Sequence, residues 1–202
     1  MQAAIAPDGV AVDVARHARQ IALPEVGPEG QARIAAARVA VIGADRAAET
    51  AALYLRAAGV GQVFEATDLL DDARMGEALK NMVRNFDLVI RSGFDDAPMD
   101  AVAARLGLPA IFVRATPEAV DMVAFSGRVP SSEARADVPF QAASTAPADD
   151  ASAVLAGTLA AAEALHAIVR EASGPFTPSI RHLRLPLDGR EPLVQEIGRP
   201  AS

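Results

Sequence analysis

The amino-acid sequence predicts an α/β protein with a Rossmann-like fold, in which a mostly parallel sheet carries helices on both faces and ends in an antiparallel C-terminal extension. Three observations predict this fold. Residues 39–42 form an apolar, β-branched run of the kind that is buried on both faces of a parallel sheet. Apolar runs then alternate with helix-forming segments as far as residue 114. Residues 120–125 have the pattern of an added antiparallel strand.

Local signals place the individual elements. The alanine-rich segment 47–58 favours a helix, and Gly107 ends the helix expected at 98–106. A glycine and a proline, Gly174 and Pro175, stop a long apolar helix near residue 171. The expected helices are 31–37, 47–58, 72–83, 98–106 and 152–171. The expected strands are 39–42, 62–66, 88–91, 110–114, 120–125, 180–186 and 192–197, with a turn at residues 188–189 between the last two.

Length and charge narrow the class of protein. With 202 residues, 51% of them hydrophobic, the chain suits one domain with a sizeable core. We expect a flexible N-terminal segment at 1–13 and one domain at 14–200, with a mobile loop near 128–150. A formal charge of −7 without a basic stripe argues against nucleic-acid binding. The absence of a long apolar stretch or a cationic leader predicts a cytoplasmic protein that does not contact membranes.

The chain contains no cysteine. A zinc site with cysteine ligands needs thiolates, and sulfur transfer through a persulfide or thioester needs a cysteine thiol. We therefore expect neither zinc nor sulfur chemistry on this chain. The three histidines, His17, His166 and His182, lie in different expected elements and lack the spacing of metal ligands. The sequence therefore predicts no metal site.

The segment after the strand at 39–42 has the outline of a phosphate-binding turn. Gly43 follows that strand and precedes a helix, the arrangement in which three glycines let the backbone cradle phosphates. Here Asp45 stands at the second glycine position and Ala48 at the third. A carboxylate about 4 Å from a phosphate costs roughly 1 kcal/mol in water and about 4 kcal/mol at an effective dielectric near 20. Binding then weakens roughly fivefold to a thousandfold, unless Arg46 turns inward and offsets the charge. We expect Asp45 to project into the space of the phosphates.

Segments on both sides of this turn form a series that spans most of residues 14–197. They are residues 16–21, 23–27, 30–31, 38–43, 54–61, 87–90, 108–110, 127 and 157–165. This series resembles the ThiF/MoeB/HesA family, the bacterial relatives of ubiquitin-activating E1 enzymes. Because the segments occur in the family's order, the resemblance is more specific than a lone glycine motif.

The resemblance implies a homodimer that uses ATP and magnesium to adenylate the C-terminal glycine of a small ubiquitin-like sulfur carrier. It also implies that Arg16, which matches the first arginine of the family's RxxRQ motif, reaches the nucleotide of the neighbouring subunit. The alternative is that Arg16 is simply an exposed N-terminal side chain. The apolar helix at 152–171 independently favours a dimer, because it is apolar nearly all round.

This chain departs from the family where the family's chemistry lies. Thr67 stands at the position of the ribose-binding aspartate, and Asp68 follows one residue late. The catalytic aspartate is replaced by Phe94, with Asp95 directly after it. Lys80, the only lysine, stands at nearly the spacing of the family's phosphate-binding lysine; the alternative is a surface residue paired with a glutamate one helical turn away. The family's third strand is missing from this part of the chain.

These departures favour a degenerate, non-catalytic member that serves as a dimeric partner-binding or regulatory scaffold for an active relative or a carrier protein. Two alternatives stay open. One is a divergent ATP-dependent adenylyltransferase that acts through Arg46, Asp68, Lys80 and Asp95. The other is a small-molecule or dinucleotide-binding module that kept the fold and changed its ligand.

Overall fold

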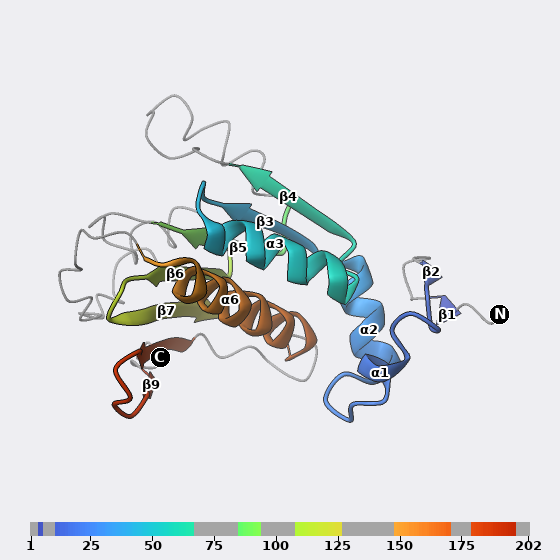
Figure 1. Ribbon diagram of the computed structural model, residues 1–202. Coiled ribbons are helices and arrows are strands. Elements are labelled where there is room, and N and C mark those ends of the chain that lie inside the picture. Colours follow the sequence, from blue (N-terminus) through green and yellow to red (C-terminus); the bar gives the residue numbers. More distant parts are fainter. Residues whose placement is uncertain are drawn as a thin grey trace, which may run out of the picture.

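The computed structural model describes residues 4–5, 11–66, 85–93, 108–126, 148–170 and 179–196. Its centre is a seven-stranded sheet with the strand order β4-β3-β5-β6-β7-β8-β9 (Figure 1). The strands are β3 (Arg38–Ile42), β4 (Gln62–Ala66), β5 (Leu88–Ser92), β6 (Ala110–Ala115), β7 (Ala119–Ser126), β8 (Ser179–Pro186) and β9 (Leu193–Glu196). From β4 to β6 the strands run parallel, and β7, β8 and β9 each run antiparallel to the strand before them. The predicted Rossmann-like α/β fold with an antiparallel C-terminal extension is confirmed.

The described helices are α1 (Ala18–Ile21), α2 (Gly27–Ala36), α3 (Arg46–Ala58) and α6 (Asp150–Arg170), and two short strands, β1 (Ala4–Ile5) and β2 (Ala11–Val12), pair near the N-terminus. Helices α3 and α6 pack on one face of the sheet, where Val39, Val41 and Ile90 contribute to the main core (Figure 1). The helices expected at 72–83 and 98–106, and the loop expected near 128–150 up to residue 147, lie outside the described residues.

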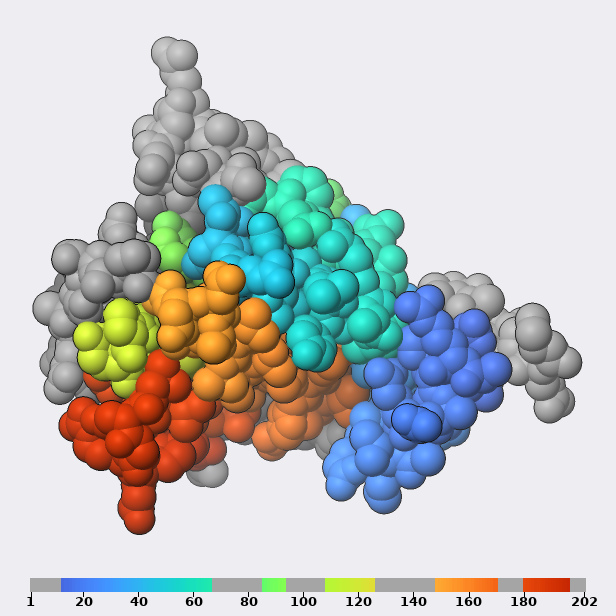
Figure 2. Space-filling view, viewed as in Figure 1, coloured from blue at the N-terminus to red at the C-terminus, as the bar shows by residue number. Residues whose placement is uncertain are grey.

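Helices α3 and α6 approach each other closely, and Figure 2 shows them side by side on one surface of the molecule. A Cβ atom at Gly157 of α6 would lie 2.3 Å from the carbonyl oxygen of Ala47 on α3, so this position requires glycine. The buried side of α6 is made of small residues, and only Ile168 among them is large. Small side chains therefore set the distance between the two helices.

Helix α6 is long and apolar enough to cross a membrane, by length and composition alone. It nevertheless packs against α3 and the sheet, and 44% of its most apolar 18-residue window is buried inside the fold. The position of α6 is that of a core helix. The larger apolar side chains of this helix that are only partly buried, such as Leu155 and Leu159, pack against the core.

The N-terminal segment is fastened to the C-terminal end of α3. Gln31 is buried and donates from Nε2 to the carbonyl oxygen of Ala58 over 3.0 Å. Gly59 ends α3 with a φ of 90°, and a Cβ atom there would lie 2.7 Å from Nε2 of His17. His17 and Gln31 therefore both contact the turn at the C-terminal end of α3. These two contacts hold the N-terminal segment against α3.

Candidate functional site

The turn between β3 and α3 leaves no room for a side chain at Gly43. Its φ is 151°, and a Cβ atom would lie 3.1 Å from the Cβ atoms of Ala48 and Ser92. The backbone N–H of Gly43 donates to the carbonyl oxygen of Ala66 on β4 over 2.9 Å. The turn is therefore tight, and it lies at the carboxyl edge of the parallel strands, where α/β folds bind their ligands.

Asp45 is the N-cap of α3. Its Oδ1 accepts the backbone N–H of Ala48 over 2.9 Å, and its Oδ2 accepts the hydroxyl of Ser92 over 2.7 Å. Unpaired N–H groups and the helix dipole both favour a negative charge at the start of a helix. The carboxylate of the chain itself therefore occupies one of the donors that a phosphate would use in a phosphate-binding turn.

The partner of Asp45 at the end of β5 is a residue that the sequence did not single out. Ser92 is only 3% exposed, and the next residue, Gly93, has a φ of 64°. A Cβ atom at Gly93 would lie 3.0 Å from Oδ2 of Asp45. Ser92 and Gly93 therefore both lie in close contact with the Asp45 carboxylate.

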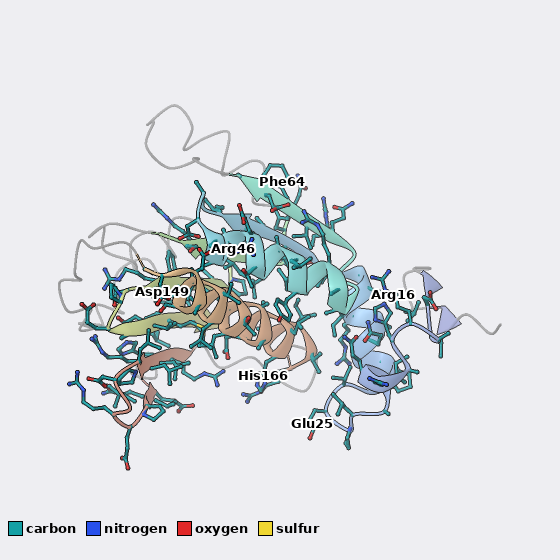
Figure 3. The ribbon with its side chains drawn as sticks, in the orientation of Figure 1. Arg16, Glu25, Arg46, Phe64, Asp149 and His166 are labelled. Carbon is teal, nitrogen blue, oxygen red and sulfur yellow. The ribbon has the colours of Figure 1, made fainter. Side chains whose placement is uncertain are left out.

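Arg46 does not turn toward Asp45. Its Nη1 lies 3.0 Å from Oε2 of Glu49, one turn further along α3, and both side chains are largely exposed (Figure 3). Exposed pairs of this kind contribute little to stability. In this structure Arg46 therefore does not offset the charge of Asp45 at the turn.

Arg16 and the glycine turn lie at opposite ends of α3 (Figure 3). The next residue, His17, contacts Gly59 after the C-terminal end of α3, whereas Asp45 is the residue before its N-terminal end. The 13 residues of α3 correspond to about 20 Å. The exposed Arg16 of one chain is therefore remote from the glycine turn of the same chain.

Four other candidate residues, Thr67, Asp68, Lys80 and Asp95, lie outside the described residues, as does Phe94. Thr67 directly follows β4 and Phe94 follows Gly93 after β5, and both strands flank β3. Parallel strands end at a common edge, so the ends of β4 and β5 lie beside the glycine turn.

Among the residues with described positions, no group of three or more His, Cys, Asp or Glu side chains is arranged to hold a metal ion. A second polar group does occur on β7 and β8. Asp121 is 3% exposed, and its Oδ1 lies 3.4 Å from Nη1 of Arg184 and 3.5 Å from Nε2 of His182. Asp121 and Arg184 are opposite each other in the β7–β8 register, which sequence reasoning could not provide.

No family model matches the chain. Over 81 residues it is 41% identical to the adenylyltransferase and sulfurtransferase MOCS3 of Bos taurus, an alignment of 37% of this chain and 18% of that protein. Over 58 residues it is 43% identical to the SAMP-activating enzyme E1 of Haloferax volcanii, covering 29% of this chain and 22% of that protein. Over 48 residues it is 52% identical to the sulfur carrier protein adenylyltransferase of Thermus thermophilus, covering 24% and 18%. The chain thus matches 18% to 22% of the length of these curated relatives.

Solved structures share the fold over nearly the whole chain. Escherichia coli MccB with MccA-N7isoASN gives a TM-score of 0.64 at 12% identity, covering 93% of this chain and 73% of that one. The same protein with ATP gives 0.62 at 12% identity, covering 91% and 72%. PaaA gives 0.62 at 14% identity, covering 92% and 73%. At these identities the similarity is one of fold.

Proposed function

Because this chain belongs to the ThiF/MoeB/HesA family of E1-like proteins, we propose that it is a member that no longer adenylates and that serves as a dimeric partner-binding or regulatory scaffold. Its partner in this role is an active relative or a ubiquitin-like carrier protein. The fold provides the surface for that partner, while the nucleotide turn stays closed.

The observation that carries this proposal is the hydrogen bonding of the Asp45 carboxylate. Its carboxylate accepts from the N–H of Ala48 and from the hydroxyl of Ser92, so both of its oxygens are bonded. A phosphate at the same helix end would have to displace this carboxylate. Each hydrogen bond to a charged group contributes about 1.5–3 kcal/mol, and a carboxylate that stays nearby adds roughly 1–4 kcal/mol of repulsion. By either route, losing the bonds of the carboxylate or keeping its charge beside the phosphate, the turn binds phosphate more weakly.

Two further features support the loss of activity. The chain has no cysteine, so it cannot itself carry sulfur as a persulfide. Arg46, which the sequence offered as a counter-charge to Asp45, is instead paired with Glu49. A sulfur-transfer role would therefore require another protein to provide the thiol.

A divergent adenylyltransferase is the second candidate, and the names of the relatives favour it. MOCS3 and the Thermus thermophilus protein are both named adenylyltransferases. This function would require the Asp45 carboxylate to give up its hydrogen bonds with Ala48 and Ser92, so that ATP and magnesium could reach the turn. Arg46, Asp68, Lys80 and Asp95 would then have to bind and activate the nucleotide.

Pyrophosphate exchange separates the two candidates. The protein would be incubated with ATP, magnesium, labelled pyrophosphate and a small ubiquitin-like carrier ending in Gly-Gly, with an active relative as the positive control. We expect no exchange with this chain alone, together with measurable binding to the carrier or to the active relative. Exchange above background that depends on the carrier would refute the scaffold and support the enzyme. Failure to bind either partner would also refute the scaffold.

A further inference from the structure

The sheet has a second face, opposite to the one on which α3 and α6 pack. Val89 on β5, Phe112 on β6 and Val123 on β7 are each at most 1% exposed, yet they do not belong to the core cluster that α3 and α6 share with the sheet. Successive residues of a strand point to opposite faces, so residues two positions away from these three lie on the second face as well. The charged residues among them are Arg91, Arg114 and Asp121.

Strand pairing brings two arginines together on the second face. In the parallel β5–β6 pair Arg91 is the partner of Phe112, and Arg114 is two residues further along β6. Strands lie about 4.8 Å apart and two residues span about 6.6 Å along a strand, so the two arginine Cα atoms are about 8 Å apart. Both side chains are half-buried. We call these two residues the arginine pair.

Positive charge is in excess on the second face, although the chain has a formal charge of −7. Besides His182, the charged side chains that β5, β6, β7 and β8 place there are Arg91, Arg114, Arg184 and Asp121. The carboxylate of Asp121 lies 3.4 Å from Nη1 of Arg184 and 3.5 Å from Nε2 of His182, both on β8. Two like charges that are close together and half-buried repel each other, and an anion placed between them removes this repulsion.

The arginine pair lies at the carboxyl edge of the sheet, since each arginine is the last residue but one of a parallel strand. Open α/β sheets bind ligands at this edge, at the point where the strand order reverses. The order β4-β3-β5 places the reversal between β3 and β5. Ser92 follows Arg91, points to the opposite face and donates to Asp45. The closed glycine turn and the arginine pair therefore lie on opposite sides of the same strand end.

We propose that the arginine pair binds a compact dianion, which is a phosphate group either free or carried as a monoester. A guanidinium group binds phosphate oxygens in a bidentate manner, and two of these groups offset two negative charges. Arg91 and Arg114 each make a further interaction within the fold, and the five N–H donors of a guanidinium group allow it to bind an anion at the same time. The site does not require Asp45 to move. It goes beyond the proposed function and does not depend on it.

Titration with inorganic phosphate, monitored by phosphorus nuclear magnetic resonance at low ionic strength, tests the inference. We expect saturable binding with a dissociation constant of about 1 mM or tighter. Arg91→Met and Arg114→Met should each weaken binding at least about tenfold. Arg170→Met is the matched control, because it removes an exposed arginine at the C-terminal end of α6, and it should leave the dissociation constant unchanged. Glycerol phosphate as a second ligand distinguishes the two sources, since the tighter binder of the two identifies a monoester or the free anion.

Conservative variants keep the test decisive if a methionine variant does not fold, which circular dichroism would detect. Arg91→Lys and Arg114→Lys retain the charge and lose the planar fork, so they should bind phosphate more weakly than the wild type. A wild type without saturable binding, or arginine variants that bind as tightly as the wild type, would overturn the inference. Phosphate binding that increases only when Asp45 and Ala48 are replaced by glycine would place the anion at the glycine turn and also overturn it. Pyrophosphate exchange by the wild type, in contrast, contradicts only the proposed function.

Discussion

The hydroxyl of Ser92 donates to the carboxylate of Asp45 over 2.7 Å, and so joins the end of β5 to the start of α3. The two residues are 47 positions apart in the sequence. The second oxygen of the same carboxylate caps the helix at Ala48. An aspartate at the second glycine position therefore serves as a structural group as well as a charge that opposes phosphate.

The first prediction concerns Ser92. Ser92→Ala removes the hydroxyl that donates to Asp45, and we expect the free energy of unfolding to fall by about 1–2 kcal/mol. Urea denaturation monitored by circular dichroism would measure the change. Thr158→Ala is the control, because this hydroxyl donates to Val154 within the same helix, and its loss should cost less than about 0.5 kcal/mol. Equal effects of the two substitutions would contradict a special role for the Ser92–Asp45 bond.

A second prediction concerns the contact between α3 and α6. In Gly157→Ala the new Cβ atom would meet the carbonyl oxygen of Ala47 at 2.3 Å, so the helices must move apart. Overpacking of this kind costs about 1–3 kcal/mol, and the variant should unfold at lower temperature. Gly189→Ala is the comparison, since nothing lies within 4 Å of its Cβ position and only the backbone cost at a φ of 83° remains. A Gly157→Ala protein as stable as the wild type would show that the two helices are less closely packed than described.

The third prediction is a pH dependence at the start of α6. Hydrogen bonds from Ser152 lower the pKa of Asp149 below its usual 3.8. A depressed pKa in the folded state means that Asp149 stabilises the protein above the unfolded-state value and loses this contribution as pH falls through the folded-state value. The stability difference between the wild type and Asp149→Ser should therefore be largest near neutral pH and shrink below about pH 4. Serine is a suitable comparison because it retains an N-cap hydroxyl without a charge. A difference that is constant between pH 3 and 7 would contradict the account.

Much of the sheet could be predicted from the sequence, because buried parallel strands are short contiguous apolar runs. The strand expected at 39–42 is β3 (Arg38–Ile42), which is buried over its last four residues. The strand expected at 62–66 is β4 (Gln62–Ala66), which lies at the edge of the sheet and is more exposed. The helix expected at 31–37 in fact begins at Gly27. Two glycines around Pro28 resemble a turn in sequence, yet proline is favoured in the first turn of a helix. This boundary was wrong by one turn for that reason.

The contacts of the site could not be predicted in the same way. The sequence drew attention to Asp45 through the glycine motif, but Ser92 is brought to it only by the β3–β5 pairing. The pair formed by Asp121 and Arg184 likewise depends on the β7–β8 register. A motif describes neighbours in the chain, whereas these contacts depend on which strands lie side by side.

The closed glycine turn is tested most directly by calorimetric titration of the wild type with ATP and magnesium, with AMP and NAD as further ligands. The account predicts a dissociation constant weaker than about 1 mM for ATP in the wild type. Replacing both Asp45 and Ala48 by glycine should bring binding into the measurable range, and Asp45→Asn, which keeps a cap and removes the charge, should lie between the two. Saturable binding of ATP to the wild type at micromolar concentration would contradict the account, as would a double-glycine variant that binds no better than the wild type.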